Sequence, residues 1–299
     1  MSTSLSGRLA GLPRPLWVLL LILPLIAGTA FAPRPVALAG PRTVTYCSGQ
    51  AMDIYEPAGL RVPAPVVLHI HGGSLRGGHR SSDDFFSEPP VVPWLVAHGF
   101  VVASIDYRLL PRNPWPDQIV DAGCAVRYLR AHAARLDIDP DRVGAIGTSA
   151  GGFLASFLGT ASGVPHPFFD RGAYAGRSSA VDAVVDLYGH VDPGQPHGYL
   201  GHHVSTRTRD QSIPASHITP QDPPFLIIQG MVDRRVPAHD SRRLYEQLCA
   251  QGVPASLVMV HNGPHGLEQA DERPDREVLA VRIEDFLERQ LVYAGTRTA

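Results

Sequence analysis

From residue 43 onward, short runs of apolar and β-branched residues alternate with longer stretches of helical periodicity. Several of the runs are apolar on both faces, as strands in the middle of a parallel sheet must be. The alternation predicts an α/β fold with a mostly parallel central sheet flanked by helices. The predicted strands of this sheet are residues 66–71, 101–106, 143–147, 183–187, 225–229 and 256–260.

Apolar residues recur every three or four positions between these strands, which predicts helices there. The predicted helices are residues 115–135, 150–159, 239–251 and 276–291, and the periodic positions of the last one are Val278, Val281, Ile283, Phe286 and Leu287. Residues 43–46 and 52–55 are predicted to form two short leading strands, antiparallel to each other.

Two segments, 160–180 and 190–222, break this rhythm because they are rich in Gly, Pro, His and polar residues. They follow strands, which is where open α/β sheets place their binding loops. They are therefore predicted to wall a binding pocket. A plain surface loop is the alternative, because no periodicity shows which side chains point inward.

The clearest chemical signal is the hexapeptide GTSAGG, which starts at Gly147, between a predicted strand and a predicted helix. A serine hydroxyl is a weak nucleophile until a base takes its proton. A tight strand-to-helix turn would present Ser149 above the sheet, at a helix N-terminus that favours developing negative charge. Gly147 and Gly151 suit such a turn because side chains there would crowd it. Ser149 is the predicted nucleophile.

A second signal, His71-Gly72-Gly73, lies at the end of an upstream strand. Backbone N–H groups exposed by consecutive glycines can donate to the oxyanion of a tetrahedral intermediate, together with the N–H of Ala150. Gly72, Gly73 and Ala150 are the predicted oxyanion hole, whereas a glycine pair alone would indicate only a turn. The His71 side chain is predicted to brace this loop by hydrogen bonding rather than to transfer protons.

The acid and the base of such a site follow the nucleophile along the chain, each on a loop after a later strand. Asp233 comes just after the strand at 225–229, and His265 just after the strand at 256–260. A carboxylate bound to the imidazole holds the useful tautomer and stabilises the imidazolium that forms when Ser149 loses its proton. Asp233 and His265 are the predicted acid and base.

Other residues compete for these two roles. Among the 14 histidines, His261 is the nearest competitor for the base, but it lies within or at the edge of a strand. Asp222 precedes its strand, and Asp240 begins a helix, where Asp commonly caps. Asp186, within a strand, is the more serious alternative acid.

The chain of 299 residues carries 26 basic and 28 acidic side chains with no long run of one sign, so no nucleic-acid partner is expected. Cys47, Cys124 and Cys249 are far apart and no pair has metal-ligand spacing, so no metal or other cofactor is expected. One disulfide with one thiol left over suits an oxidising compartment. Alternatively, Cys124 and Cys249 are small hydrophobic residues buried in helices. This interpretation is favoured for Cys124, and neither interpretation is preferred for Cys47.

Residues 1–39 differ in kind from the rest. Two arginines precede an apolar run, 16–28, and a small-residue cleavage site ends at Ala39. This order predicts an export signal, which leaves residues 43–292 as one secreted catalytic domain. Without a cut, an apolar stretch near the lower limit of about 17 residues for a bilayer span would tether the domain to the outer face of the cell membrane.

Five stretches, in their order along the chain, resemble the α/β-hydrolase superfamily and in particular its esterase and lipase branch. That branch includes hormone-sensitive-lipase-like carboxylesterases and feruloyl and acetylxylan esterase-like enzymes. The stretches are HIHGGSLRGG, SIDYRLLP, DPDRVGAIGTSAGGFLA, PPFLIIQGMVDRRVP and NGPHGL. The resemblance implies the α/β-hydrolase fold, with the triad and the oxyanion donors at the positions named above.

The resemblance also implies that the Asp-Tyr-Arg segment at 106–108 buttresses the oxyanion loop. Ser74 stands where many relatives have glycine and Leu75 where an aromatic is frequent, which changes the acyl side of the pocket. The chain has no long N-terminal helical cap, and its insert at 190–222 is short. A small lid from loop insertions and an open site for small or short-chain esters are therefore expected.

These observations predict a serine carboxylesterase that works through an acyl-enzyme intermediate. A serine peptidase of the prolyl-oligopeptidase type is one alternative, because the stretches around Asp233 and His265 also resemble those enzymes. No propeller-type repeat region accompanies the domain, which favours the ester. A non-catalytic binding protein on the same fold is the other alternative, and the presence of all three triad residues argues against it. The sequence does not indicate an oligomeric state.

Overall fold

The structure is a computed structural model that describes residues 40–60, 63–81, 91–163, 165–169, 172–192, 200, 205–269 and 271–293. The export signal or anchor predicted for residues 1–39 lies outside the described residues. Within the described ranges, no helix combines the length and the apolar character that a membrane crossing requires.

The described strands form one eight-stranded sheet in the order β1-β2-β4-β3-β5-β6-β7-β8. β1 and β2 are antiparallel, as predicted, and β2 also runs antiparallel to β4, whereas all remaining neighbours are parallel. The strands are β1 (Arg42–Thr45), β2 (Ala51–Tyr55), β3 (Ala64–Ile70), β4 (Val101–Ile105), β5 (Ile138–Thr148), β6 (Ala183–Leu187), β7 (Phe225–Gly230) and β8 (Ala255–Val260). The predicted mostly parallel sheet is confirmed.

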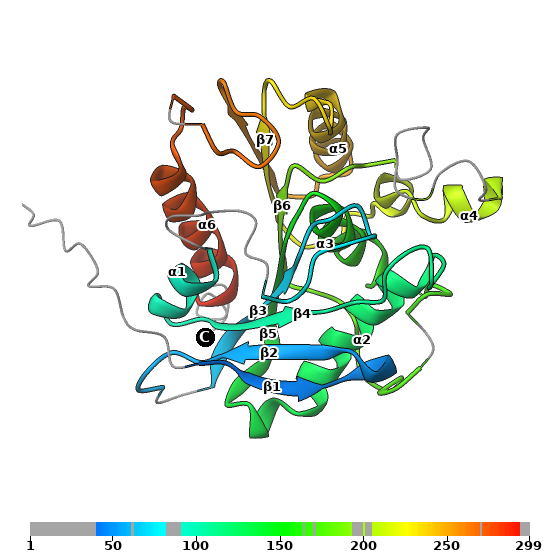
Figure 1. Ribbon diagram of the computed structural model, residues 1–299, viewed down its shortest axis with the longest axis vertical. Helices are drawn as coiled ribbons and strands as arrows, with labels where there is room; N and C mark the ends of the chain where they lie inside the picture. Colours follow the sequence, from blue (N-terminus) through cyan, green and yellow to red (C-terminus); the bar gives the residue numbers. More distant parts are fainter. Residues whose placement is uncertain are drawn as a thin grey trace, which may run out of the picture. The chain divides into compact units, whose positions relative to one another are not determined.

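Helices cover both faces of this sheet: α1 and α6 lie on one face, and α2, α3 and α5 on the other (Figure 1). The helices are α1 (Val91–Ala97), α2 (Asp117–Ala131), α3 (Ala150–Ala161), α4 (Thr206–Asp210), α5 (Ala238–Ala250) and α6 (Arg276–Leu291), with 3-10 turns at η1 (Cys47–Gly49), η2 (Ala133–Arg135) and η3 (Pro214–His217). The four predicted helices are confirmed. α1 and α4 were not predicted, because each is too short to show a helical period.

Two hydrophobic cores form because the strands in the middle of the sheet, such as β3 and β4, are buried on both faces. On β3, Val66, Leu68 and Ile70 belong to the core under α2, α3 and α5, whereas Val67 belongs to the core under α1 and α6. This alternation follows from the two-residue period of a strand.

In α6 only some of the predicted apolar positions are buried in the core. Val278 and Val281 are each 42% exposed, while Ile283 and Leu287 are fully buried. Leu279, outside the predicted periodic set, is also fully buried, so the face that packs on the sheet begins one residue later than the pattern indicates.

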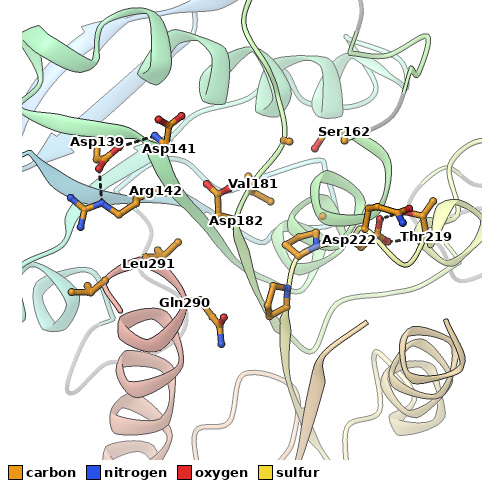
Figure 2. A pocket seen from close by; sticks show the side chains of 17 residues that line it. Asp139, Asp141, Arg142, Ser162, Val181, Asp182, Thr219, Asp222, Gln290 and Leu291 are labelled. Atoms are coloured by element: carbon orange, nitrogen blue, oxygen red, sulfur yellow. Dashed lines mark hydrogen bonds and ion pairs between the residues drawn. The ribbon is translucent and has the colours of Figure 1, made fainter. Parts of the chain in front are cut away.

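A cavity of about 830 Å³ lies at the edge of the sheet where the parallel strands begin (Figure 2). Its walls include Asp182 just before β6, Asp222 just before β7 and Leu291 at the end of α6. Since every parallel strand runs away from this edge, the cavity lies at the opposite end of the sheet from the loops that follow the strands.

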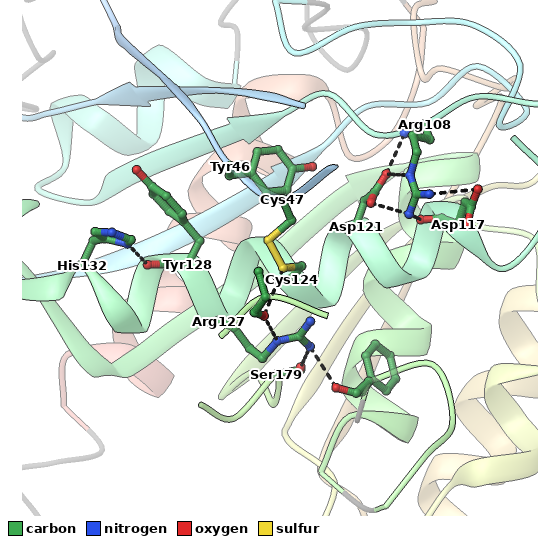
Figure 3. The surroundings of a disulfide bond; sticks show 12 residues. Tyr46, Cys47, Arg108, Asp117, Asp121, Cys124, Arg127, Tyr128, His132 and Ser179 are labelled. Atoms are coloured by element: carbon green, nitrogen blue, oxygen red, sulfur yellow. Dashed lines mark hydrogen bonds and ion pairs between the residues drawn. A yellow bond between two sulfur atoms is a disulfide. The ribbon is translucent and has the colours of Figure 1, made fainter. Parts of the chain in front are cut away.

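Cys47 and Cys124 form a disulfide that joins η1 to α2, with 6.1 Å between their Cα atoms (Figure 3). The two residues are 77 positions apart. Cys124 is buried, as favoured from the sequence, but it is bonded rather than a free core thiol. The burial considered for Cys249 is wrong, because this free cysteine lies exposed on α5.

Candidate active site

Ser149 occupies a tight turn between β5 and α3, with a φ of 51°. Its backbone N–H donates to the carbonyl of Leu187 at 2.9 Å, which ties the turn to β6. A positive φ is strained for a residue with a side chain and persists only where the surrounding structure holds it. A Cβ at Gly151 would collide with the carbonyl of Ile70, and one at Gly147 with the backbone of Gly151. The two glycines therefore permit the close packing that holds Ser149.

The structure brings Ser149, His265 and Asp233 together in one hydrogen-bonded line. His265 Nε2 lies 3.1 Å from Ser149 Oγ, and His265 Nδ1 lies 2.8 Å from Asp233 Oδ2. The three residues follow β5, β8 and β7, so they meet at the edge where the parallel strands end. This arrangement lets an imidazole take the serine proton while a carboxylate holds the other ring nitrogen.

Asp233 is shielded from solvent and firmly held. Its side chain is 0% exposed, and Oδ1 accepts the N–H groups of Arg235 at 2.7 Å and Val236 at 2.9 Å. Burial raises the pKa of this carboxyl, but the bonds from His265 and from these backbone groups outweigh burial, so its pKa lies below the usual value. Asp233 therefore stays ionised and available to an imidazolium.

Two side chains that the sequence did not single out complete this part of the site. Gln229, fully buried at the end of β7, donates from Nε2 to Asp233 Oδ2 at 3.1 Å and accepts from Ser241. The ring of Tyr188 packs edge-on against the imidazole of His265, with 4.8 Å between the centroids. The sequence signal that identifies Gln229 is its place at the end of the apolar run FLIIQ, because a polar side chain buried in such a strand needs a hydrogen-bond partner.

The loops that carry the acid and the base touch backbone to backbone. A Cβ at Gly230 would collide with the carbonyl of Gly263, and the N–H of Val232 donates to that carbonyl at 3.1 Å. The positions of Asp233 and His265 are therefore coupled through their loops.

Two of the predicted oxyanion residues, Gly72 and Ala150, lie beside Ser149. A Cβ at Gly72 would lie 3.5 Å from the Cβ of Ser149, so this glycine borders the nucleophile directly. Gly73 has a φ of 108°, and a Cβ there would collide with the carbonyl of Gly77, which fits the tight turn of the loop. Ala150 is the first residue of α3, and the first four N–H groups of a helix have no partner within it.

Residues 106–110, which follow β4, contact the predicted oxyanion loop at residues 71–75. The Tyr107 hydroxyl donates to the carbonyl of His71 at 3.0 Å, and the two rings stack at 4.3 Å. The N–H of Leu110 donates to the carbonyl of Leu75 at 2.7 Å. His71 Nδ1 lies 2.7 Å from the carbonyl of Gly72, in keeping with a bracing role.

Salt bridges fix the same segment to its surroundings. Asp106 accepts from the backbone and side chain of Arg80, each at 2.7 Å. Arg108 forms a two-pronged pair with Asp121 on α2, at 2.8 Å for each contact (Figure 3). Such planar pairs give strong and directional contacts.

The competing acids and the competing base have other partners. Asp186 accepts from Ser156 and from the backbone of Gly189, and His261 pairs through its backbone with Arg273. Asp222 accepts from the backbone and side chain of Thr219 (Figure 2).

The capping role considered for Asp240 is wrong. Pro237 is the N-cap of α5, and Asp240 lies inside the first turn with its carboxylate 3.1 Å from His190 Nδ1.

The two irregular segments are partly described. From the first, Phe168 and Phe169 are buried beside Trp115 and Phe157 rather than lying as plain surface loop. In the second, residues 193–199 and 201–204 lie outside the described part of the chain. Their role as pocket walls stays a prediction. Among the residues that the structure describes, no group of three or more His, Cys, Asp or Glu is arranged to hold a metal ion.

Comparison with known proteins finds relatives of the chain in both sequence and fold. The BD-FAE family model matches residues 52–248 of the chain. Esterase LipC of Mycobacterium tuberculosis is 30% identical over 217 residues, which are 67% of this chain and 52% of that protein. The chain spans about half the length of the curated relatives it matches.

Two solved structures share the fold over most of the chain. A truncated form of a carbohydrate esterase from gut microbiota is 26% identical with a TM-score of 0.72, covering 87% of this chain and 98% of that one. An acetyl ester-xyloside bifunctional hydrolase from Caldicellulosiruptor lactoaceticus is 25% identical with a TM-score of 0.69, covering 81% of this chain and 88% of that one. The likeness thus extends well beyond the short motifs around the serine.

Proposed function

The chain belongs to the BD-FAE family of α/β-hydrolases, and we propose that it is a serine carboxylesterase. The observation that carries the proposal is the hydrogen-bonded line from Ser149 Oγ through His265 to Asp233. Esterase relatives of similar sequence support hydrolysis of an ester as the reaction.

In the proposed mechanism, Ser149 Oγ attacks the ester carbonyl while His265 Nε2 accepts its proton. The backbone N–H groups of Gly72, Gly73 and Ala150 receive the oxyanion of the tetrahedral intermediate. The imidazolium then gives its proton to the leaving alcohol, which leaves an acyl group on the serine. His265 next activates a water that attacks the acyl group, and the acid departs as the serine regains its proton.

We propose small or short-chain acyl groups, including acetyl groups on carbohydrates, as substrates. The support is the acetyl and carbohydrate esterase activity named for the two structural relatives. On the oxyanion loop, Leu75 is fully buried while Ser74 is exposed, so the serine and not the leucine faces the solvent side of the loop. A small polar residue at this point leaves the loop surface open.

The test compares the purified protein with Ser149→Ala on p-nitrophenyl esters of two, four and eight acyl carbons. Loss of the nucleophile should lower kcat by at least about a thousandfold. Ser162→Ala, a change at the far end of α3, is the matched control and should keep full activity. Near-wild-type turnover by Ser149→Ala would contradict the mechanism.

A fluorophosphonate probe and amide substrates separate the alternatives. Labelling of Ser149 with turnover of esters supports the esterase. Cleavage of peptide amides where esters fail would favour the peptidase, and neither labelling nor turnover would favour a binding protein.

We also propose that the protein is exported and cut after Ala39. The Cys47–Cys124 disulfide supports this, because such bonds persist in oxidising compartments. Mass spectrometry of the protein recovered from culture medium should find Gly40 as the first residue. Recovery of the intact chain only from the membrane fraction would favour an uncut anchor instead.

A further inference from the structure

Asp186 is a buried carboxylate directly beneath the turn that carries the nucleophile. It is the fourth residue of β6, pairs in register with Gly147 of β5 and is 1% exposed. Its Oδ2 accepts the hydroxyl of Ser156 on α3 at 2.7 Å, and its Oδ1 accepts the N–H of Gly189 at 2.8 Å. The carboxylate thus joins α3 to the turn that follows β6.

Two glycines make room for this carboxylate. A Cβ at Gly152, in the first turn of α3, would lie 2.5 Å from Asp186 Oδ1, and a Cβ at Gly189 would also collide with that oxygen. Because both neighbours lack a side chain, α3 and the turn after β6 close tightly around the carboxylate. The contact is therefore specific to a residue of this size and polarity.

The turn held in this way contains Tyr188, whose ring contacts His265. Tyr188 has a φ of 47°, and its N–H donates to the carbonyl of Ile228 at 2.8 Å. A positive φ is uncommon for a bulky residue, and such strain is kept only where neighbouring contacts impose it. The buried ring lies 4.8 Å from the imidazole of His265 at an interplanar angle of 65°.

We propose that Asp186 is a positioning residue for the reaction: by clamping the turn 187–189 onto α3, it presses the ring of Tyr188 against His265 and keeps the imidazole in line with Ser149. This inference rests on the proposed function, since it assigns His265 as the base.

Burying the charge of Asp186 opposes folding, which argues that the carboxylate has a functional role. Burial raises the pKa of Asp186 to about 6, although the bonds from Ser156 and Gly189 act to lower it. An asparagine could make both contacts without a charge, since its oxygen can accept from Gly189 and its amide can donate to the Ser156 hydroxyl. Geometry and charge can therefore be separated by substitution. Among the described contacts, the ring of Tyr188 packs against the titratable imidazole of His265, whose Nδ1 lies 2.8 Å from Asp233 Oδ2.

The experiment measures kcat, KM and the pH profile on p-nitrophenyl acetate for Asp186→Ala, Asp186→Asn and Tyr188→Leu. Asp186→Ala should lower kcat by a factor of about 10 to 100, with KM within about twofold, since the base and not the binding surface is disturbed. Tyr188→Leu should do the same. Asp186→Asn should recover kcat to within about threefold of the unmodified protein, because the clamp is retained. Asp285→Ala, at an exposed position on α6, is the matched control.

Two further readouts distinguish positioning from a merely structural role. The double variant Asp186→Ala with Tyr188→Leu should be no slower than the slower single variant, because both changes act on one path to His265. In both single variants the acid limb of the kcat profile should move to lower pH, since an imidazolium held less firmly against Asp233 is less stabilised. The inference would be overturned if the kcat losses of the single variants multiply in the double variant. It would also be overturned if the acid limb of the kcat profile does not move, or if only KM changes.

Should Asp186→Ala fail to fold, Ser156→Ala carries the same test, because it removes only one donor to the carboxylate. A loss of about threefold or more in kcat with KM unchanged supports the clamp, and an unchanged kcat overturns it. If the wild-type protein is active and is labelled by the fluorophosphonate probe, while kcat of the variants is unchanged, this inference alone is overturned. Wild-type protein with neither labelling nor turnover overturns the proposed function, and the inference with it.

Discussion

Gln229 donates its side-chain amide to the same Asp233 oxygen that His265 Nδ1 contacts, at 3.1 Å and 2.8 Å respectively. The acid of the proposed triad is thus held by Gln229, a residue of the strand that precedes it, as well as by the base. Because Gln229 is fully buried, water cannot take its place.

Gln229→Leu should lower kcat by roughly tenfold, because a hydrogen bond to a charged group contributes about 1.5–3 kcal/mol and part of that loss falls on the transition state. Steady-state kinetics on p-nitrophenyl acetate measure it. Gln251→Ala, at an exposed position after α5, should have no effect. Equal activity of the two variants would show that Asp233 does not depend on Gln229.

Tyr107→Phe removes the hydroxyl that donates to the carbonyl of His71 at 3.0 Å. The oxyanion loop loses a fixed point, so kcat should fall by about five- to tenfold, the effect of roughly one hydrogen bond, with little change in KM. Tyr174→Phe, on an exposed tyrosine, is the matched control. A rise in KM at constant kcat would instead place Tyr107 in substrate binding.

Removal of the disulfide by Cys47→Ser with Cys124→Ser should lower the free energy of unfolding by about 2–5 kcal/mol, because the bond closes a long loop in the unfolded chain. Urea denaturation with and without a reducing agent measures this effect. The control, Cys249→Ser, should unfold like the unmodified protein because that thiol is free and exposed. Matching curves for the double variant and the control would contradict the pairing.

Asp186→Asn should gain stability relative to the unmodified protein as pH rises. The pKa of Asp186 is raised from 3.8 to about 6 in the folded state, so ionisation opposes folding once the pH exceeds the unfolded value. The two proteins should differ by a constant amount below about pH 4, and the variant should gain on the order of 3 kcal/mol between about pH 4 and pH 6. Denaturation curves at four pH values test this. Parallel pH dependence would show that Asp186 titrates normally.

The sheet and the meeting of the three proposed catalytic residues could be predicted because each signal is local. Ser149, Asp233 and His265 each come shortly after an apolar strand, and parallel strands bring their ends to one end of the sheet. The motif at Ser149 and the order of the strands along the chain therefore predict that these residues meet.

Contacts between distant segments could not be predicted in the same way. Cys47 and Cys124 are 77 residues apart, and nothing in their neighbourhoods indicates that η1 packs on α2. Asp186 is a competing acid in the sequence because it lies within a strand, whereas its partners Ser156 and Gly189 come from α3 and from the turn after β6. Val278 and Val281 match a helical period, but which part of the period faces the sheet is decided by packing.

The contact between Gly230 and Gly263 has a practical consequence for protein engineering. A mutant library that varies the stretch after β7 alone, or the stretch after β8 alone, samples changes that the other stretch must follow. Combinatorial libraries that vary both together give compensating pairs a chance to appear. Selections for new leaving groups should therefore treat these two stretches as one mutational block.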